Sequence, residues 1–458
     1  MNYLEFLKLA APEAIVVATA LVVLALGLTR ARGNEIPGAV ATLGLTAAAG
    51  VLLMLPTQAT LFGGMLVISP LTVLFKIICL ALALFTVLLP SGSRFPLENR
   101  SEQIAMILFG TVGLLLLVGS EELLMIFIGL ELTGLSLYIL TAFDRRELRS
   151  AEAGLKYFLF GSTASAFTLF GLSFIYGLTG TTSLAGIASK LTTTPITPLL
   201  AVAIVMTLIG FAFKVAAAPF HLWAPDAYEG APVASAAFIA SGSKVASFVV
   251  LGKILLIGLA PAHGSAAWHA MIAGWSPLIA VLAAVSIVIG NLVALAQKNL
   301  RRLLAYSAVA HAGYTLLGLV TAERAGFAAT LFYTTIYAFT LVGAFAVVAH
   351  VRRETGGDAI SNFANLRARS PLLAGCMAIF LLSLAGLPPL AGFFGKFYLF
   401  TVAMRAGQNH GLLWLVALAL FGSLISLYYY LVVLKVIFTT DRKGDAPAHI
   451  LRIGFGQS

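Results

Sequence analysis

Charged residues are scarce in this chain: Asp, Glu, Lys and Arg make up only 10% of its 458 residues, whereas 60% are hydrophobic. A water-soluble domain has about a quarter of its residues charged, so this composition excludes one. The hydrophobic residues also gather in runs of about 20, the length that an α-helix needs to cross the hydrocarbon core of a bilayer. The composition therefore indicates an integral membrane protein made of helices.

Cysteines and nucleotide-binding motifs are also scarce or missing. The two cysteines, Cys79 and Cys376, lie in hydrophobic runs, and no CxxC pair or other metal-ligand spacing occurs. This pattern supports neither a disulfide framework nor an iron–sulfur site. The sequence holds no GxGxxG or Walker A pattern, so no nucleotide site is expected. We therefore predict no cofactor or metal in this chain, and any redox or ATP energy must come from a partner.

The hydrophobic runs predict an all-α polytopic membrane protein with about 13 transmembrane helices. The first run lacks the basic start of a signal peptide and carries Glu5, Lys8 and Glu13 instead, so it is expected to be a retained helix. The predicted spans are 12–31, 37–56, 70–90, 103–119, 122–142, 155–178, 198–228 (broken), 231–259, 276–296, 302–321, 327–349, 371–404 (broken) and 411–438.

The net charge of +10 does not indicate nucleic-acid binding, because the basic residues alternate with the predicted membrane topology. Cytoplasmic loops of membrane proteins are enriched in Lys and Arg, which places the N-terminus outside and the C-terminus in the cytoplasm. The cytoplasmic loops would hold Arg30, Arg32, Arg94, Arg100, Arg145, Arg146, Arg149, Lys156, Lys298, Arg301, Arg302, Arg352, Arg353, Arg367, Arg369, Arg442, Lys443 and Arg452, and the opposite loops only Lys8, Lys190, Arg324 and Arg405.

The stretch 211–232, FAFKVAAAPFHLWAPDAYEGAP, is the most informative part of the chain. Lys214 lies inside its hydrophobic run, shortly before Pro219. An ionisable residue within a membrane span is costly and usually functional, and proline breaks a helix. A broken helix at membrane depth is tolerated only where protein or a wet cavity satisfies the freed backbone groups. The stretch therefore indicates a proton or ion path.

Two further ionisable residues are expected near the membrane midplane. Glu131 lies some 15 Å along its helix, about half of the hydrocarbon thickness, and would balance the charge of Lys214. The structural alternative is a protonated glutamate bonded to a neighbouring Ser or Thr. Lys244 is near the middle of the span 231–259 among small polar residues that suit water. Snorkelling to the lipid headgroups is disfavoured for Lys244, because both surfaces are roughly 20 Å away along the helix.

The second half of the chain repeats this pattern. His311 lies in a helix with Tyr306, Ser307 and Tyr314, and histidine suits proton relay, although a histidine in a helix can also be a satisfied core residue. Lys396 follows a break at Gly386, Pro388 and Pro389, as Lys214 adjoins Pro219. We predict a three-helix segment 1–100, two five-helix repeats 101–260 and 261–440 inverted in the membrane, and a cytoplasmic tail 441–458. Inverted repeats with broken helices are typical of ion-coupled transport.

Other ionisable residues have simpler interpretations. Lys76 is expected to snorkel or to face a neighbouring helix, and Lys253 to be an anchor near the outer end of its span. Lys156 is interpreted either as an interfacial anchor or as functional. Glu121 and Glu122 are expected on a solvated rim.

Several motifs together resemble one known family over essentially the whole chain. HLWAPDAYEGAP at 221–232, GLPPLAGFFGKF at 386–397, and the ionisable residues Glu131, Lys214 and Lys244 are similar to the antiporter-like subunits of respiratory complex I. Among the three such subunits the resemblance is to subunit N of bacterial NADH–quinone oxidoreductase. YEGAP and the lysine at 396 favour N over M, and a chain without a long lateral helix argues against L.

This resemblance implies a proton-translocating membrane-arm subunit of an NADH:quinone oxidoreductase in the bacterial inner membrane. FMN, iron–sulfur clusters and quinone would be bound by partner subunits, namely M-like and K-like membrane neighbours and a peripheral NADH dehydrogenase arm. The proton path implied by the family comprises Glu131, Lys214, Lys244, His311 and Lys396. Subunit N usually has fourteen helices, so the final helix is expected to be absent here or the chain to be truncated.

Two other functions compete with this one. A cation/proton antiporter subunit of the multisubunit sodium/proton type shares proline-broken elements but couples to a cation gradient instead of a redox reaction. A structural anchor with residual channel residues would tolerate replacement of its buried lysines by methionine. The proteins that copurify in mild detergent would distinguish the first alternative.

Overall fold

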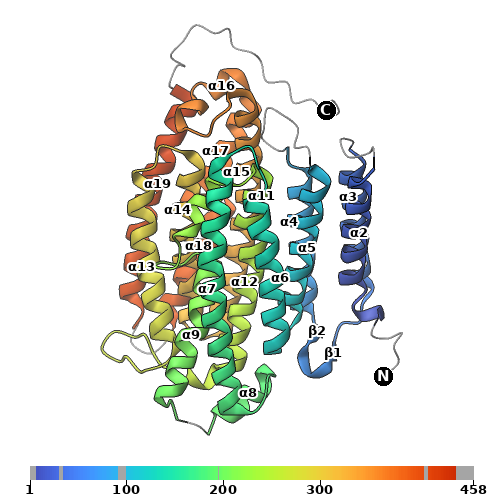
Figure 1. Cartoon of the computed structure of the whole chain (residues 1–458). Coiled ribbons are helices and arrows are strands. Elements are labelled where there is room, and N and C mark those ends of the chain that lie inside the picture. Colours follow the sequence, from blue (N-terminus) through green and yellow to red (C-terminus); the bar gives the residue numbers. More distant parts are fainter. Residues whose placement is uncertain (1–6, 30–34, 91–98, 194, 407–410, 440–458) are drawn as a thin grey trace.

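A computed structural model describes residues 7–29, 35–90, 99–193, 195–406 and 411–439. Its helices run side by side in one bundle, as Figure 1 shows, and confirm the all-α membrane fold. In the described part of the chain, 11 helical spans are long and apolar enough to cross a membrane. The shorter apolar helices Ala11–Gly27 and Pro371–Ala385 occupy the predicted first and twelfth spans. The predicted tail 441–458 lies outside the described residues.

The N-terminal part of the bundle contains five helices and a small hairpin that sequence reasoning did not predict. The two short antiparallel strands pair over three residues each and lie at the lower end of the bundle in Figure 1. The elements are α2 (Ala11–Gly27), α3 (Ile36–Met54), β1 (Ala59–Leu61), β2 (Leu66–Ile68), α4 (Pro70–Leu88), α5 (Arg100–Gly119) and α6 (Leu123–Thr141).

The middle part contains the first predicted broken span, which the structure divides into α9 and α10. The predicted eighth span, 231–259, is also interrupted, at Ser241, although it was expected to be continuous. The elements are α7 (Leu148–Thr179), α8 (Leu184–Leu191), α9 (Pro198–Val215), α10 (Trp223–Gly230), α11 (Val233–Ala240) and α12 (Gly242–Lys253), followed by a π-helical turn at Ile254–Gly258.

The C-terminal part contains the second broken span, divided as predicted at Gly386 between α17 and α18. Both breaks contain a cis peptide bond, before Pro219 and before Pro389. The elements are α13 (Trp275–Leu295), α14 (Leu300–Val320), α15 (Arg324–Thr355), α16 (Leu366–Arg369), α17 (Pro371–Ala385), α18 (Ala391–Arg405) and α19 (Leu413–Thr439).

Three spans begin with the same local signal, a hydroxyl residue followed by proline. The side chains of Ser69, Thr197 and Ser370 each accept a hydrogen bond from a backbone N–H in the first turn of α4, α9 and α17. Hydroxyl residues are favoured at this capping position, and proline is favoured at the first helical position because its missing N–H is not needed there. The sequence thus sets the starts of these helices locally.

The centre of the bundle is formed by α11, α12 and α14. The hydrophobic window of Val233–Gly258 is entirely buried and that of Leu300–Val320 is 94% buried, against 33% for α3 and α7. A helix that is covered on all sides can hold ionisable groups away from lipid, whereas peripheral helices face the acyl chains. The fold therefore places Lys244 and His311 in the interior.

Candidate functional site

Lys214 lies in the last turn of α9, directly before the predicted break. The helix ends because Ala216 adopts a left-handed conformation (φ 59°) and Pro219 follows. The freed backbone groups find side-chain partners: Trp223 donates from Nε1 to the Phe213 carbonyl at 3.0 Å, and the Ser286 hydroxyl accepts from the N–H of Ala218 at 2.8 Å. These bonds explain how an interrupted helix is tolerated inside a membrane bundle.

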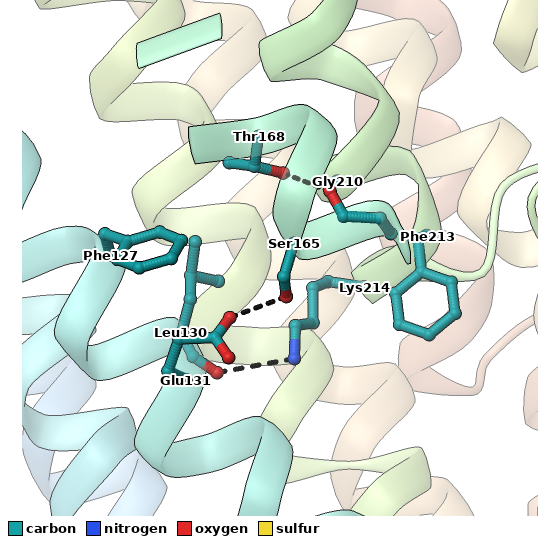
Figure 2. A pocket seen from close by; sticks show the side chains of 9 residues that line it. Phe127, Leu130, Glu131, Ser165, Thr168, Gly210, Phe213 and Lys214 are labelled. Atoms are coloured by element: carbon teal, nitrogen blue, oxygen red, sulfur yellow. Dashed lines mark hydrogen bonds between the residues drawn. The ribbon is translucent and has the colours of Figure 1, made fainter. Parts of the chain in front are cut away.

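Glu131 and Lys214 line the same small cavity, as predicted. The side chains point toward the same space in Figure 2, although among the described residues no ion pair joins them. Ser165 of α7 donates to Glu131 Oε1 at 2.5 Å, and Lys214 Nζ donates to the Leu130 carbonyl at 3.4 Å. The cavity measures about 10 Å³, which is close to the lower limit for one water molecule. A single water could therefore join the acid to the amine.

Glu131 and Lys214 differ in the exposed fraction of their side chains. Lys214 is 7% exposed, whereas Glu131 and Ser165 are only half-buried in the isolated chain. The acid of this pair thus lies at the rim of the bundle, in the seam between α6 and α7. A half-buried acid within a membrane span needs a cover other than lipid, because lipid cannot solvate its charge.

Lys244 is 2% exposed in the first turn of α12, just after the break at Ser241. Its Nζ donates to the Ala308 carbonyl of α14 at 3.1 Å and lies 5.6 Å from the ring centroid of Tyr337. The predicted serines flank Lys244, but Ser243 donates to the Ile239 carbonyl of α11 and Ser247 to the Ser243 carbonyl of α12. A carbonyl and an aromatic face hold this amine instead.

Lys396 is 4% exposed on α18 and is held from three sides. Its Nζ donates to the Ala385 carbonyl at the end of α17 at 3.0 Å and to the Ser423 hydroxyl at 2.9 Å. It also lies 5.1 Å from the ring centroid of Tyr314. The break in this span therefore supplies a free carbonyl to the lysine that follows it.

His311 lies on α14 between these two lysines. Its ring is 5.0 Å from that of Tyr337, which contacts Lys244, and 5.6 Å from that of Tyr314, which contacts Lys396. Sequence reasoning predicted the histidine but missed the residues that bind its two nitrogens, Tyr333 and Tyr430. The only available signal was the presence of paired tyrosines in otherwise apolar helices.

Lys76 faces a neighbouring helix, one of its two predicted placements, and forms a buried ion pair with Glu13 of α2 at 2.6 Å. The simpler interpretations of three other residues need correction. Lys253 was expected to be an anchor but is 3% exposed, donating to the carbonyls of Val118 at 2.9 Å and Ser120 at 3.3 Å. The free carbonyls at the end of α5 attract this cation. The predicted solvated rim is also wrong: Glu121 pairs with Lys253 at 3.3 Å, and Glu122 is buried and caps α6.

The charged end of the motif at 221–232 forms a network with neighbouring helices. Asp226 accepts from Lys156 of α7 at 2.9 Å and from Arg302 of α14 at 2.9 Å. Glu229 accepts from Arg302 at 3.0 Å and from Asn299 at 3.1 Å. Lys156 is thus bound within the chain, and α10 is fastened to two other helices. In the described residues no cluster of three His, Cys, Asp or Glu side chains could hold a metal.

Comparison with known proteins gives a consistent result. The family described as NADH:quinone oxidoreductase/Mrp antiporter, TM, matches residues 120–426. NADH-quinone oxidoreductase subunit N 2 of Acidobacterium capsulatum is 46% identical, over 97% of this chain and 92% of its own length. A chain of respiratory complex I from Thermus thermophilus with bound aureothin is 34% identical with a TM-score of 0.77, over 94% of this chain and 92% of that chain.

A chain of the Mrp complex from Dietzia shares the fold, with 22% identity and a TM-score of 0.81 over 98% of this chain and 85% of that chain. The matched family includes both NADH:quinone oxidoreductase subunits and Mrp antiporter subunits. The 46% identity to subunit N, over 92% of the length of that relative, assigns this chain to the first group. The chain therefore belongs to the family of subunit N of NADH-quinone oxidoreductase, an antiporter-like, proton-translocating subunit of the membrane arm of respiratory complex I.

Proposed function

We propose that protons cross this subunit by way of Glu131, Lys214, Lys244, His311 and Lys396. The Glu131–Lys214 pair receives a proton, which passes inward to Lys244 and then by way of His311 to Lys396. Lys214, Lys244 and Lys396 lie at or beside a helix break, where carbonyls accept hydrogen bonds from their amines. Glu131 faces the cavity of Lys214 from α6, and His311 lies on the central helix α14. The order of residues follows the order of their helices along the chain, from α6 to α18.

The observation that carries this proposal is the surroundings of Lys244 and Lys396. In the described part of the chain, neither amine forms an ion pair with a carboxylate, and each is bonded to carbonyls or a hydroxyl. A buried ammonium without a counter-ion is costly, so a role in structural ion pairing does not explain these two lysines. Lysines that serve only as structural ion pairs, such as Lys76 with Glu13, have a carboxylate partner instead.

The subunit is part of the respiratory complex I assembly, and members of its family in general carry no redox cofactor. The finer proposal is that FMN, iron–sulfur clusters and quinone are bound by partner subunits, including a peripheral NADH dehydrogenase arm. M-like and K-like subunits would be its membrane neighbours. The half-buried Glu131 supports a protein neighbour at the seam of α6 and α7, since lipid would leave its charge unsolvated.

The proposed orientation is that of a protein of the bacterial inner membrane with its N-terminus outside and its C-terminus in the cytoplasm. The described basic residues Arg149, Arg302 and Arg352 support this, because all lie at helix ends on one side of the bundle. Two inverted five-helix repeats, 101–260 and 261–440, also belong to the proposal. They are supported by α7 and α15, which have 32 residues each, and by the left-handed residues that end α9 and α17.

The decisive experiment replaces Lys244. Lys244→Met removes the titratable amine but keeps an unbranched side chain, so we expect normal assembly with loss of most NADH-driven proton uptake. Lys244→Arg is expected to fail as well, because a guanidinium group does not release its proton. Proton uptake and NADH–quinone activity are measured in membrane vesicles and normalised to assembled complex.

The matched control is Lys298→Met, which removes an exposed lysine between α13 and α14 and should leave uptake unchanged. Normal pumping by Lys244→Met would exclude Lys244 from the path and favour the structural-anchor alternative. Uptake that required a sodium gradient and not NADH would instead support the antiporter alternative.

A further inference from the structure

Four side chains in the interior form one continuous chain of hydrogen bonds. The hydroxyls of Ser307 and Tyr430 share a hydrogen bond, and the Tyr430 hydroxyl also bonds Nε2 of His311 at 3.1 Å. Nδ1 of His311 bonds the hydroxyl of Tyr333. All four residues are at most 2% exposed, so bulk water does not reach them from the surface. We call Ser307, Tyr430, His311 and Tyr333 the hydroxyl–imidazole chain.

The two ends of this chain lie beside two of the buried lysines. At one end, Ser307 precedes Ala308, whose carbonyl accepts the hydrogen bond from Lys244. At the other end, the ring of Tyr333 packs against the backbone of Gly395, the residue before Lys396. A Cβ added at Gly395 would lie 2.5 Å from Cδ2 of Tyr333, which explains why glycine is required for this approach.

We propose that Tyr430 and Tyr333 are proton-relay residues that carry protons between Lys244 and Lys396 by way of His311, and that the hydroxyl–imidazole chain reverses its polarity each time a proton passes. The proposal rests on the proposed roles of these two lysines and the histidine. It adds the two tyrosines that connect the lysines to the histidine, and the reversal of hydrogen-bond direction that accompanies each proton.

The chemistry of the groups allows two arrangements in which every hydrogen bond of this chain runs in the same direction. Each hydroxyl can donate one hydrogen bond and accept others, and a neutral imidazole donates from one nitrogen and accepts at the other. In the first arrangement Ser307 donates to Tyr430, Tyr430 to Nε2, and Nδ1–H to Tyr333. In the second, Tyr333 donates to Nδ1, Nε2–H to Tyr430, and Tyr430 to Ser307. The heavy-atom geometry is the same in both.

Passage of one proton converts the first arrangement into the second. A proton arrives on Ser307 Oγ from the Lys244 side, and the hydrogen between Ser307 and Tyr430 moves to Tyr430. The former Tyr430 hydrogen moves to Nε2 of His311, and the Nδ1 hydrogen moves to Tyr333. Tyr333 releases its own hydroxyl hydrogen to the Lys396 side. One proton enters and one leaves, so the charge of the chain is unchanged and only the tautomer of His311 has switched.

Because of this reversal, the relay passes one proton and must then be reset before it can pass another. A second proton cannot follow in the same direction until the hydroxyls turn and the imidazole returns to its first tautomer. A chain of water molecules has no group that must return to a particular tautomer, because each water is free to rotate. The sealed tyrosine chain therefore passes single protons, which suits a pump that must not leak.

The test removes each hydroxyl in turn. Tyr430→Phe and Tyr333→Phe keep the ring and its packing but interrupt the chain on either side of His311. Because a positioned proton-transfer group contributes about 10²–10⁴-fold to a rate, we expect NADH-driven proton uptake to fall by about tenfold or more in each variant. If a phenylalanine variant does not assemble, Ser307→Ala provides the same test with a smaller change in volume, and it should also lower uptake.

Two measurements separate relay from packing. The matched control is Tyr228→Phe, a fully buried tyrosine whose hydroxyl has no hydrogen-bond partner among the described residues, and uptake should be unchanged there. The ratio of uptake rates in H₂O and D₂O should rise in the chain variants, because transfer across the gap becomes rate-limiting. A purely structural loss would lower both rates equally and leave the ratio unchanged.

The outcomes distinguish this inference from the function on which it rests. If Lys244→Met abolishes uptake while Tyr430→Phe and Tyr333→Phe pump normally, the relay is wrong and the role of Lys244 stands. If all three variants pump normally, the proposed path itself is wrong. Loss of uptake with an unchanged solvent ratio in assembled Tyr430→Phe would assign the tyrosine to packing and overturn the relay.

Discussion

Around Lys214 an acid and an amine face one small cavity at the rim of the bundle, whereas around His311 two lysines are separated by tyrosines in a sealed interior. The first site holds Glu131, which is half-buried and bonded to Ser165. In the second site no carboxylate pairs with Lys244 or Lys396 in the described residues, and His311 is 1% exposed. The two sites therefore differ in the groups that face their amines.

This difference indicates a division of labour. At the rim, an acid faces the amine across one cavity, and that acid is accessible to whatever covers the chain. In the interior, the amines are bonded to fixed carbonyls and a hydroxyl that nothing outside can contact. We expect the first site to respond to the rest of the complex and the second to pass protons onward at a fixed affinity.

The largest effect should come from removing the amine at the rim. Lys214→Met deletes the group that receives the proton, so proton uptake per assembled complex should fall by about tenfold or more, as for loss of a positioned proton-transfer group. Lys435→Met, an exposed lysine on α19, is the control and should have no effect. Wild-type uptake by Lys214→Met would show that protons enter the interior without the rim site.

A smaller effect is expected from changing the acid. Glu131→Gln keeps an acceptor for Ser165 but removes the carboxylate that faces Lys214 across the cavity. Uptake should therefore fall several-fold. Glu131→Asp keeps the charge and should retain most of the uptake. Equal loss in both variants would mean that side-chain length, and not charge, is what matters at this position.

The smallest effect should come from Ser165→Ala. A hydrogen bond to a charged group contributes about 1.5–3 kcal/mol, and its loss frees the carboxylate of Glu131 to turn toward Lys214. The carboxylate would then bind the Lys214 amine directly, so uptake should slow by about two- to threefold at unchanged assembly. Uptake rates as a function of NADH turnover measure this. A loss as large as that of Glu131→Gln would place the serine itself on the route.

The sequence predicted the features that depend on local chemistry. Proline removes a hydrogen bond from a helix interior, and glycine is favoured where a helix ends, so the ends of α9 near Pro219 and of α17 at Gly386 were predicted. Lysines inside long hydrophobic runs identified Lys214, Lys244 and Lys396 as buried, and the structure confirms their burial. The interruption at Ser241 lacks a proline and was missed.

The contacts of each residue could not be predicted, because they come from distant helices. Lys253 looks like an anchor from its place near a helix end, but the carbonyls that bind it belong to α5, more than a hundred residues away. The tyrosines that bind His311 lie on α15 and α19, and nothing near the histidine indicates them. Sequence periodicity shows which residues are buried but not which residue lies opposite.

The short helix α10 has a mechanical consequence. Its charged end is clamped by Asp226 and Glu229 to Arg302 of α14, and Asp226 is also tied to Lys156 of α7. At its other end, Trp223 donates a hydrogen bond to the Phe213 carbonyl of α9, beside Lys214. α10 is thus a short helix that is attached to α7 and α14 by ion pairs at one end and to α9 by a hydrogen bond at the other. A displacement of α7 or α14 at the membrane surface would therefore be transmitted through α10 to the backbone beside Lys214, the amine that we propose takes up the proton.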